Sequence, residues 1–297
     1  MENFRENQSE VLEVQLSAEL AAKRDALLEL LREFGSCVVA FSGGLDSSVL
    51  AKAAQVALGD RAIAATGFSA SMAAGELETC RELAELIGIQ HEVFRTSEME
   101  NPVYQQNPPD RCYHCKSDLF ERLWELAQRR QAAVVCDGAN WDDLADYRPG
   151  SQAAREKQVR SPLAEVGLTK AELRQLAAWW RLPVWNKPAT PCLASRIAYG
   201  EQITPERLAM IDQAERLLRS LGFEPVRVRY HRGDLARIEV PQDALSRFLD
   251  PALRAQVAAR LKELGFKFVS LDLEGFRSGG LNVLVTEMSP PTKASRQ

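Results

Sequence analysis

The sequence lacks the features of several protein classes, and each absence narrows the function. No apolar run approaches the ~20 residues that a membrane-spanning helix needs. Residues Met1 to Glu19 lack the charged-then-apolar layout of a secretory signal. Positive charge is not in excess, because the sequence has 37 Lys and Arg and 41 Asp and Glu, for a net charge of −4. We therefore expect a cytoplasmic protein that acts on a small molecule, with neither membrane nor nucleic acid as a partner.

The pattern of apolar residues predicts an α/β fold. With 297 residues, 45% of them hydrophobic, the chain exceeds one typical domain. Short apolar runs typical of buried strands alternate with helical patterns, and strands are expected at 37–41, 62–68, 91–95 and 132–136, with helices at 47–58, 76–87 and 116–130. This alternation predicts a doubly wound parallel sheet, on which ligands bind outside the carboxyl ends of the strands.

A second, smaller α+β domain is expected after a junction. The stretch Asn186 to Gly200 carries two prolines and no clear periodicity. Beyond it, Thr204 caps a predicted helix, and the turn Arg232-Gly233-Asp234 predicts a hairpin. A helical pattern from 251 to 264 and a strand from 266 to 273 follow. The predicted domains are residues 1–199 and 200–297.

A glycine- and serine-rich loop joins the first predicted strand to its helix. It consists of Ser42, Gly43, Gly44, Leu45, Asp46, Ser47 and Ser48. Glycines let the backbone approach phosphates closely, and free N–H groups at a helix start bind anions. No Gly-Lys-Ser/Thr ends the loop, so it is not a Walker loop. Asp46 beside phosphates suits a magnesium ion. The loop therefore predicts ATP and Mg²⁺ as ligands.

The six cysteines fall into two groups. Three lie within strand or helix patterns and are expected to be small buried hydrophobes: Cys37, Cys80 and Cys136. Cys112 and Cys115 form a C-x-x-C, and Cys192 lies in the junction. These three residues are compatible with a redox dithiol, a zinc site or an iron–sulfur cluster on three cysteines, and also with incidental thiols. Their spacing alone does not rank the alternatives.

The loop resembles the PP-loop of ATP pyrophosphatases, which split ATP into AMP and pyrophosphate while they adenylate a substrate. This resemblance implies a HUP-like domain in which the adenine lies near the ends of the first two strands. Gly67, Phe68 and Ser69 then become candidate nucleotide contacts. Gly138 is another, because the stretch 138–143 is similar to Gly-Thr-Asn-x-Asp-Asp in relatives.

Further strings resemble one branch of these proteins, the LarE-like sulfur transferases, over about residues 17–287. They are the segments 42–48, 111–116, 146–150, 191–200, 227–229, 236–239 and 271–275. The resemblance implies that ATP activates a carboxylate of pyridinium-3,5-biscarboxylate mononucleotide and that sulfur then replaces the activated oxygen. The product is a thiocarboxylate, used in synthesis of the nickel-pincer nucleotide cofactor. Family members also suggest a homo-oligomer, whereas the sulfide source is not indicated.

The resemblance also favours one interpretation of the cysteines. In family members with a cysteine only at the position of Cys192, that residue donates its own sulfur and becomes dehydroalanine. Here Cys112 and Cys115 are present as well, as in the branch that holds a [4Fe-4S] cluster on three cysteines. The resemblance therefore implies that the cluster carries the sulfide, with sacrifice of Cys192 as the alternative.

Several polar residues near the junction and hairpin are candidate substrate contacts. Arg227 and Arg229 alternate along a predicted strand and so share a face, where their planar guanidinium groups suit a phosphate. Ser195 and Arg196, beside Cys192, are expected near the reacting carboxylate. Three carboxylates have two possible roles, as contacts to metal or substrate or as ordinary surface residues: Glu215, Glu239 and Glu274.

Two other functions compete with this hypothesis. One is a tRNA or small-molecule thiolase with the same loop; a tRNA substrate favours a strongly basic surface, which the pI of about 5.6 opposes. The other is a non-catalytic nucleotide-binding protein that senses redox state through a cluster. Such a protein would bind ATP without releasing pyrophosphate.

Overall fold

The computed structural model describes residues 15–145, 149–188 and 190–277. The described residues form two compact units. Among the described residues, the first unit draws on 15–69, 74–98, 112–145, 149–188 and 190, and the second on 70–73, 99–111 and 191–277. The string 146–150, used above for the family resemblance, lies partly outside the described residues, at Asp146, Tyr147 and Arg148.

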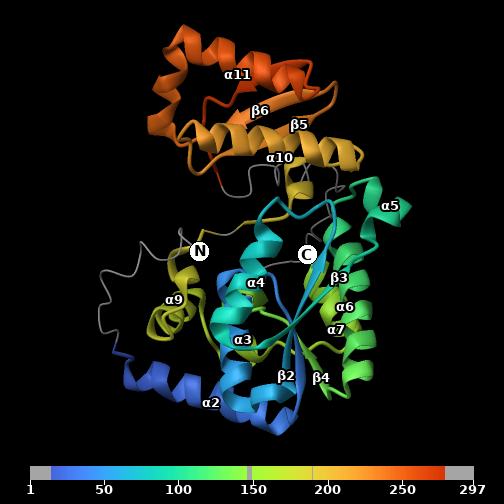
Figure 1. Cartoon of the computed structure of the whole chain (residues 1–297), viewed down its shortest axis with the longest axis vertical. Helices are drawn as coiled ribbons and strands as arrows, with labels where there is room; N and C mark the ends of the chain where they lie inside the picture. Colours follow the sequence, from blue (N-terminus) through green and yellow to red (C-terminus); the bar gives the residue numbers. More distant parts are fainter. Residues whose placement is uncertain (1–14, 146–148, 189, 278–297) are drawn as a thin grey trace, which may run out of the picture. The chain divides into compact units, whose positions relative to one another are not determined.

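A four-stranded parallel sheet forms the centre of the first unit (Figure 1). Its strands are β1 (Cys37–Ala40), β2 (Ala62–Phe68), β3 (Gln90–Arg95) and β4 (Val134–Cys136), in the spatial order β3-β2-β1-β4. The sequence order is broken at β1, which lies between β2 and β4. This arrangement confirms the predicted parallel α/β fold.

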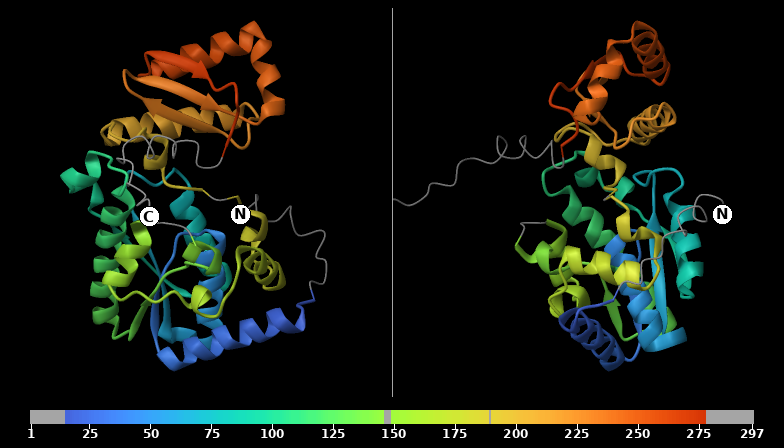
Figure 2. Two further views of the ribbon diagram at one scale, coloured as in Figure 1. Left: turned by 180° about the vertical axis from the view of Figure 1, so that it is seen from behind. Right: turned by 90° about the vertical axis from the view of Figure 1, so that its left-hand side faces the viewer.

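Helices cover both faces of this sheet, as Figure 2 shows. They are α2 (Ala18–Phe34), α3 (Leu45–Leu58), α4 (Glu76–Ile87), α6 (Arg111–Arg130), α7 (Pro149–Glu156), α8 (Pro162–Glu165) and α9 (Lys170–Trp179). Alternate residues of β1 serve the two faces: Val39 packs with α2, α3, α4 and α9, whereas Val38 packs with α6 and α7. Strand β1 is therefore buried on both sides, as its unbroken apolar run predicts.

Short 3₁₀ turns connect several of these elements in the first unit. They are η2 (Gly59–Arg61), η3 (Glu98–Glu100), η4 (Trp141–Ala145) and η5 (Pro183–Asn186). Turn η3 includes residues of both units, because Glu98 belongs to the first unit and the next residue, Met99, to the second. None of the described helices is long and apolar enough to cross a membrane.

The second unit contains a smaller three-stranded sheet. Its elements are α5 (Pro102–Gln105), η6 (Leu193–Arg196), α10 (Pro205–Ser220), β5 (Arg227–His231), β6 (Leu235–Glu239), η7 (Gln242–Leu249), α11 (Pro251–Glu263) and β7 (Phe268–Leu271). Strands β5 and β6 form the predicted antiparallel hairpin, and β7 pairs in parallel with β6. A smaller sheet-containing C-terminal part is thus confirmed.

One helix begins earlier than the sequence pattern predicts. Helix α6 starts at Arg111 rather than Lys116, directly after a turn in which the Arg111 N–H donates to the Pro108 carbonyl at 3.0 Å. Its first turn is partly exposed and shows no apolar periodicity, so the pattern could not reveal it. The C-x-x-C therefore lies within the first turns of a helix and not before it.

Candidate functional site

The glycine- and serine-rich loop follows β1 directly and leads into α3. Gly43 adopts φ +66°, a conformation that favours glycine, and Gly44 is the residue before the helix. Helix α3 starts at Leu45, two residues before the predicted start, so Asp46 lies in its first turn. The first N–H groups of a helix lack helical partners, which gives this end an affinity for anions.

Serine hydroxyls hold the loop in shape. The Ser42 N–H donates to Ser47 Oγ at 3.3 Å, and Ser47 Oγ donates to the Gly44 carbonyl at 3.2 Å. The hydroxyls of Ser42 and Ser47 also lie 3.2 Å apart. Ser42 itself is exposed, whereas Ser47 is buried. Hydrogen bonds within the loop therefore fix its conformation.

Two buried oxygens of the loop have no hydrogen-bond partner among the described residues. They are Asp46 Oδ1 and the hydroxyl of Ser48. Leaving a buried polar atom without a partner costs ~1–3 kcal/mol, so such atoms mark places where a ligand or ion completes the contacts. A carboxylate oxygen is a hard donor that suits Mg²⁺, so this observation fits the magnesium ion predicted beside the loop.

Lys170 is a residue of the site that sequence reasoning missed. Its Nζ lies 2.5 Å from Asp46 Oδ2, and both side chains are partly exposed. The capping box of α9 fixes where Lys170 stands: the Thr169 hydroxyl accepts the Glu172 N–H, and Glu172 Oε2 accepts the Thr169 N–H. Asp142 Oδ2 accepts the Lys170 N–H at 2.8 Å. A single lysine after a capping threonine gives no sequence signal of such a contact.

The stretch 138–143 supports the loop from β4. A Cβ added to Gly138 would lie 3.0 Å from the Ser47 nitrogen, so a larger residue here would push against the backbone at the start of α3. Asn140 is buried, and its side-chain oxygen accepts the Asp142 N–H at 3.0 Å. The structure therefore brings Gly138 to the loop and uses Asp142 to hold Lys170.

The predicted nucleotide-binding residues at the end of β2 contact other residues of the protein. A Cβ on Gly67 would lie 2.6 Å from Thr96 Cγ2, so packing within the protein already requires glycine there. The Ser69 hydroxyl donates to Glu98 Oε1. Contact of these residues with adenine stays a prediction. Glu98, a buried carboxylate that the sequence did not single out, belongs to their surroundings.

The cysteines divide by exposure as the sequence predicts. Three side chains are fully buried: Cys37, Cys80 and Cys136. Cys112 and Cys192 are exposed, and Cys115 is half-buried. Cys112 and Cys115 lie one turn apart on α6 in the first unit, whereas Cys192 precedes η6 in the second. Among the described residues, no three His, Cys, Asp or Glu side chains form a group that could hold a metal ion.

Arg196 is fully buried and holds the backbone around Cys192. Its guanidinium group contacts both oxygens of Glu215, at 2.9 and 3.2 Å. The remaining terminal nitrogen donates to the carbonyls of Pro191 and Cys192 and to the hydroxyl of Ser195. A buried arginine shared between one carboxylate and three neighbouring groups fixes the conformation of the turn that carries Cys192.

Two arginines, Arg227 and Arg229, alternate along β5. Arg229 is buried and contacts Glu239 Oε2 at 2.8 and 3.0 Å and the Ser195 carbonyl at 3.1 Å. Arg227 shares its face, and burial together with the charge of Arg196 lowers the pKa of Arg227 to about 10. A bound anion would favour the charged form of Arg227. Within the second unit, the predicted residues Ser195, Arg196, Arg227 and Arg229 thus form one cluster.

The three glutamates left open by the sequence have different surroundings. Glu215 and Glu239 are buried and accept hydrogen bonds from arginines. Glu274 is exposed and pairs with Arg277. Burial and partners therefore separate two structural carboxylates of the cluster from a surface one.

We expect Arg196→Met to lower the stability of the second unit strongly. Among the described residues, the change leaves the buried Glu215 in an ion pair with Arg219 alone, and breaking a buried ion pair costs ~3–5 kcal/mol. The matched control is Arg219→Met, which removes the more exposed partner of the same carboxylate. Urea unfolding should show a much larger loss for Arg196→Met. Equal losses would contradict the central place given to Arg196.

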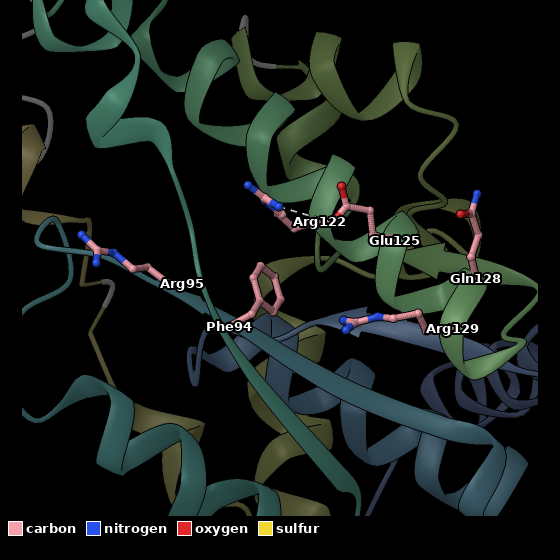
Figure 3. A pocket seen from close by; sticks show the side chains of 6 residues that line it. All are labelled: Phe94, Arg95, Arg122, Glu125, Gln128 and Arg129. Atoms are coloured by element: carbon pink, nitrogen blue, oxygen red, sulfur yellow. Dashed lines mark hydrogen bonds and ion pairs between the residues drawn. The ribbon is translucent and has the colours of Figure 1, made fainter.

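A surface hollow of about 480 Å³ lies between β3 and α6 (Figure 3). Its lining consists of Phe94, Arg95, Arg122, Glu125, Gln128 and Arg129. Arg122 contacts Glu125 within it at 3.4 Å. None of the predicted site residues lines this hollow, so it gives no support to the candidate site.

The chain is similar in sequence to several known proteins. A family model described as asparagine synthase matches residues 22–106. The chain is 37% identical over 278 residues, 93% of its length, to the whole of pyridinium-3,5-bisthiocarboxylic acid mononucleotide synthase from Lactiplantibacillus plantarum. It is 45% identical over 268 residues, 90% of its length, to the whole of an uncharacterized protein from Synechocystis sp.. A GMP synthase polypeptide from Archaeoglobus fulgidus is 28% identical over 62% of this chain and 64% of its own length.

Proposed function

Because the chain belongs to the LarE-like family of ATP-dependent sulfur transferases with a PP-loop, we propose that it converts a carboxylate of pyridinium-3,5-biscarboxylate mononucleotide into a thiocarboxylate. The name of the relative from Lactiplantibacillus plantarum gives the bisthiocarboxylic acid as its product. Two successive conversions by this protein would give the same compound, a precursor of the nickel-pincer nucleotide cofactor. The observation that carries the proposal is the loop 42–48 with its two unpartnered buried oxygens among the described residues.

Activation of the carboxylate is the first step. A substrate carboxylate oxygen attacks the α-phosphorus of ATP, the bond to the β-phosphate oxygen breaks, and pyrophosphate leaves. The N–H groups at the start of α3 would stabilise the phosphates, and Asp46 Oδ1 would be a ligand for Mg²⁺. Lys170, paired with Asp46, supplies a cation where the pyrophosphate charge develops. Activation is needed because AMP leaves the acyl carbon far more readily than hydroxide does.

In this proposal, residues of the second unit bind the phosphate of the substrate. Arg227 and Arg229 share one face of β5, and guanidinium groups bind phosphate oxygens with two parallel hydrogen bonds. Arg227 is partly desolvated, so an anion there has little water to displace. In this proposal Ser195 lies near the reacting carboxylate and Arg196 positions Cys192.

Sulfur transfer is the second step: a sulfur nucleophile forms a bond to the acyl carbon, and AMP leaves with its bonding electrons. The thiols that could hold a [4Fe-4S] cluster are those of Cys112, Cys115 and Cys192. They are the accessible cysteines of the chain, and thiolates are the usual ligands of such a cluster. When bound, the cluster would supply the sulfide that is transferred, which spares the protein.

The alternative source of sulfur is Cys192 itself. Its Sγ would form the bond to the acyl carbon, and the Cβ–Sγ bond would then break with loss of the Cα proton, leaving dehydroalanine. This route allows one transfer per protein chain, whereas the cluster route allows repeated turnover. We place the reaction in the cytoplasm, where thiols stay reduced, and expect a homo-oligomer.

The test is a reconstituted reaction of anaerobically purified protein with ATP, Mg²⁺, sulfide and the biscarboxylate mononucleotide. We expect pyrophosphate release that depends on the mononucleotide, and a thiocarboxylate product detected by mass spectrometry. Iron and acid-labile sulfide are measured on the same sample, and their loss in Cys112→Ala would support the cluster. Pyrophosphate release with tRNA alone would favour a tRNA thiolase. ATP binding without any pyrophosphate release would favour a nucleotide-binding sensor.

A further inference from the structure

Thr66 on β2 holds the residue that precedes the nucleotide loop. Its side chain is 1% exposed. Strand β1 ends at Ala40, and the next residue, Phe41, donates its N–H to the Ala65 carbonyl at 2.9 Å. The Phe41 carbonyl accepts the Thr66 hydroxyl at 2.8 Å. Both backbone polar groups of Phe41 are therefore held by β2, one of them through a side chain.

The peptide bond between Phe41 and Ser42 links Thr66 to the loop. Its carbonyl accepts from Thr66, and its N–H, which belongs to Ser42, donates to Ser47 Oγ at 3.3 Å. A peptide group is planar, so a fixed carbonyl also fixes the direction of the N–H. The Thr66 hydroxyl thus determines how one loop N–H meets the Ser47 hydroxyl.

The Thr66 hydroxyl is itself oriented by His91 on β3. His91 Nε2 lies 2.8 Å from Thr66 Oγ1. A hydroxyl has a single hydrogen, and Thr66 gives it to a carbonyl, which can only accept. His91 must therefore donate through Nε2–H. Burial lowers the pKa of His91, so the neutral ring with a hydrogen at Nε2 satisfies the contact.

Cys80 on α4 completes the cluster beneath the loop. Its side chain is fully buried beside Thr66, and burial raises the pKa of its thiol. A Cβ added to Gly43 would lie 2.9 Å from Cys80 Sγ, so the thiol packs directly against the loop backbone. Thr66, His91 and Cys80 thus come from three different elements and meet where the loop begins.

We propose that Thr66 is a positioning residue for nucleotide binding. Its hydroxyl fixes the Phe41–Ser42 peptide and, through it, the N–H and hydroxyl groups that the loop offers to the phosphates of ATP. The inference rests on the proposed function, because it takes the segment 42–48 as the loop that binds ATP. A hydrogen bond that only stabilised the sheet would contribute to unfolding free energy and leave the affinity for ATP unchanged.

The experiment compares the wild-type full-length protein with Thr66→Val, Thr66→Ser and Ser36→Ala. Valine keeps the β-branched shape and removes the hydroxyl, whereas serine keeps the hydroxyl. Ser36 is a matched control at the other end of β1, where its hydroxyl accepts the Ala133 N–H at 3.0 Å. The dissociation constant for the α,β-methylene analogue of ATP with Mg²⁺ is measured by calorimetry, and stability by urea unfolding.

We expect Thr66→Val to weaken binding of the analogue about tenfold, as loss of one hydrogen bond implies. Thr66→Ser should bind within about threefold of wild type, and Ser36→Ala should bind as wild type does even if it unfolds more easily. Wild-type affinity in Thr66→Val, or an equal loss in Thr66→Ser, would overturn the proposal.

If Thr66→Val does not fold, His91→Phe tests whether Thr66 positions the loop for nucleotide binding. It keeps a ring against Phe41, which His91 meets edge-on with 5.7 Å between centroids, and removes the donor to Thr66. Binding should weaken several-fold, and unchanged binding would overturn the proposal. If the wild-type protein itself fails to bind the analogue, the loop assignment and the proposed function fail, and the inference about Thr66 fails with them.

Discussion

The Cys192→Ala variant is expected to release pyrophosphate from ATP in the presence of the mononucleotide and yet to form no thiocarboxylate. In the proposed function, adenylation depends on the loop of the first unit, whereas Cys192 is an exposed thiol of the second. Both routes of sulfur transfer need this thiol, either as donor or as cluster ligand, so no remaining group replaces it. Pyrophosphate is measured by a coupled assay and the product by mass spectrometry.

Cys112→Ala is the control that separates the two routes. If the cluster carries the sulfide, this variant also loses iron and product. If Cys192 donates its own sulfur, Cys112→Ala still forms one product per chain, and intact-protein mass spectrometry detects dehydroalanine at Cys192. Thiocarboxylate formation by Cys192→Ala at the wild-type rate would contradict any role of Cys192.

The second large effect is expected for Asp46→Asn, which should lower the rate of adenylation about 10²–10³-fold. Asparagine keeps the shape of the side chain and removes the negative charge. Asp46 Oδ1, which has no partner among the described residues, then becomes a poorer ligand for Mg²⁺, and Oδ2 no longer balances Lys170. Mononucleotide-dependent pyrophosphate release at varied Mg²⁺ concentration measures the change.

Lys170→Met tests whether the two residues act as a pair. Because they are in contact, the double variant Asp46→Asn with Lys170→Met should be little worse than the poorer single variant. The matched control is Lys23→Met, which removes a 2.7 Å ion pair to Glu172 at the start of the same helix. It should retain adenylation. Additive effects of Asp46→Asn and Lys170→Met would show that they act independently.

The sequence by itself identified the four strands of the first sheet, the hairpin of the second unit and the loop. An unbroken apolar run at 37–41 identified a strand buried on both faces, because such strands cannot alternate with polar residues. Thr169 and Glu172 predicted a capping box that the structure contains, and Arg232-Gly233-Asp234 predicted the hairpin. These signals are local: each depends on residues that lie within a few positions of one another.

Only the tertiary structure decided which side chains meet. Lys170 reaches Asp46 across 124 positions, and Thr66 reaches the Phe41 carbonyl across 25. Neither contact leaves a periodic trace in the sequence, because a single polar residue on a helix or strand has the same pattern whether or not it has a distant partner. The burial of Arg196 against Glu215 was likewise unpredictable, since charged residues are usually exposed. Packing of the elements brought these groups together and so determined how the loop and Cys192 are held.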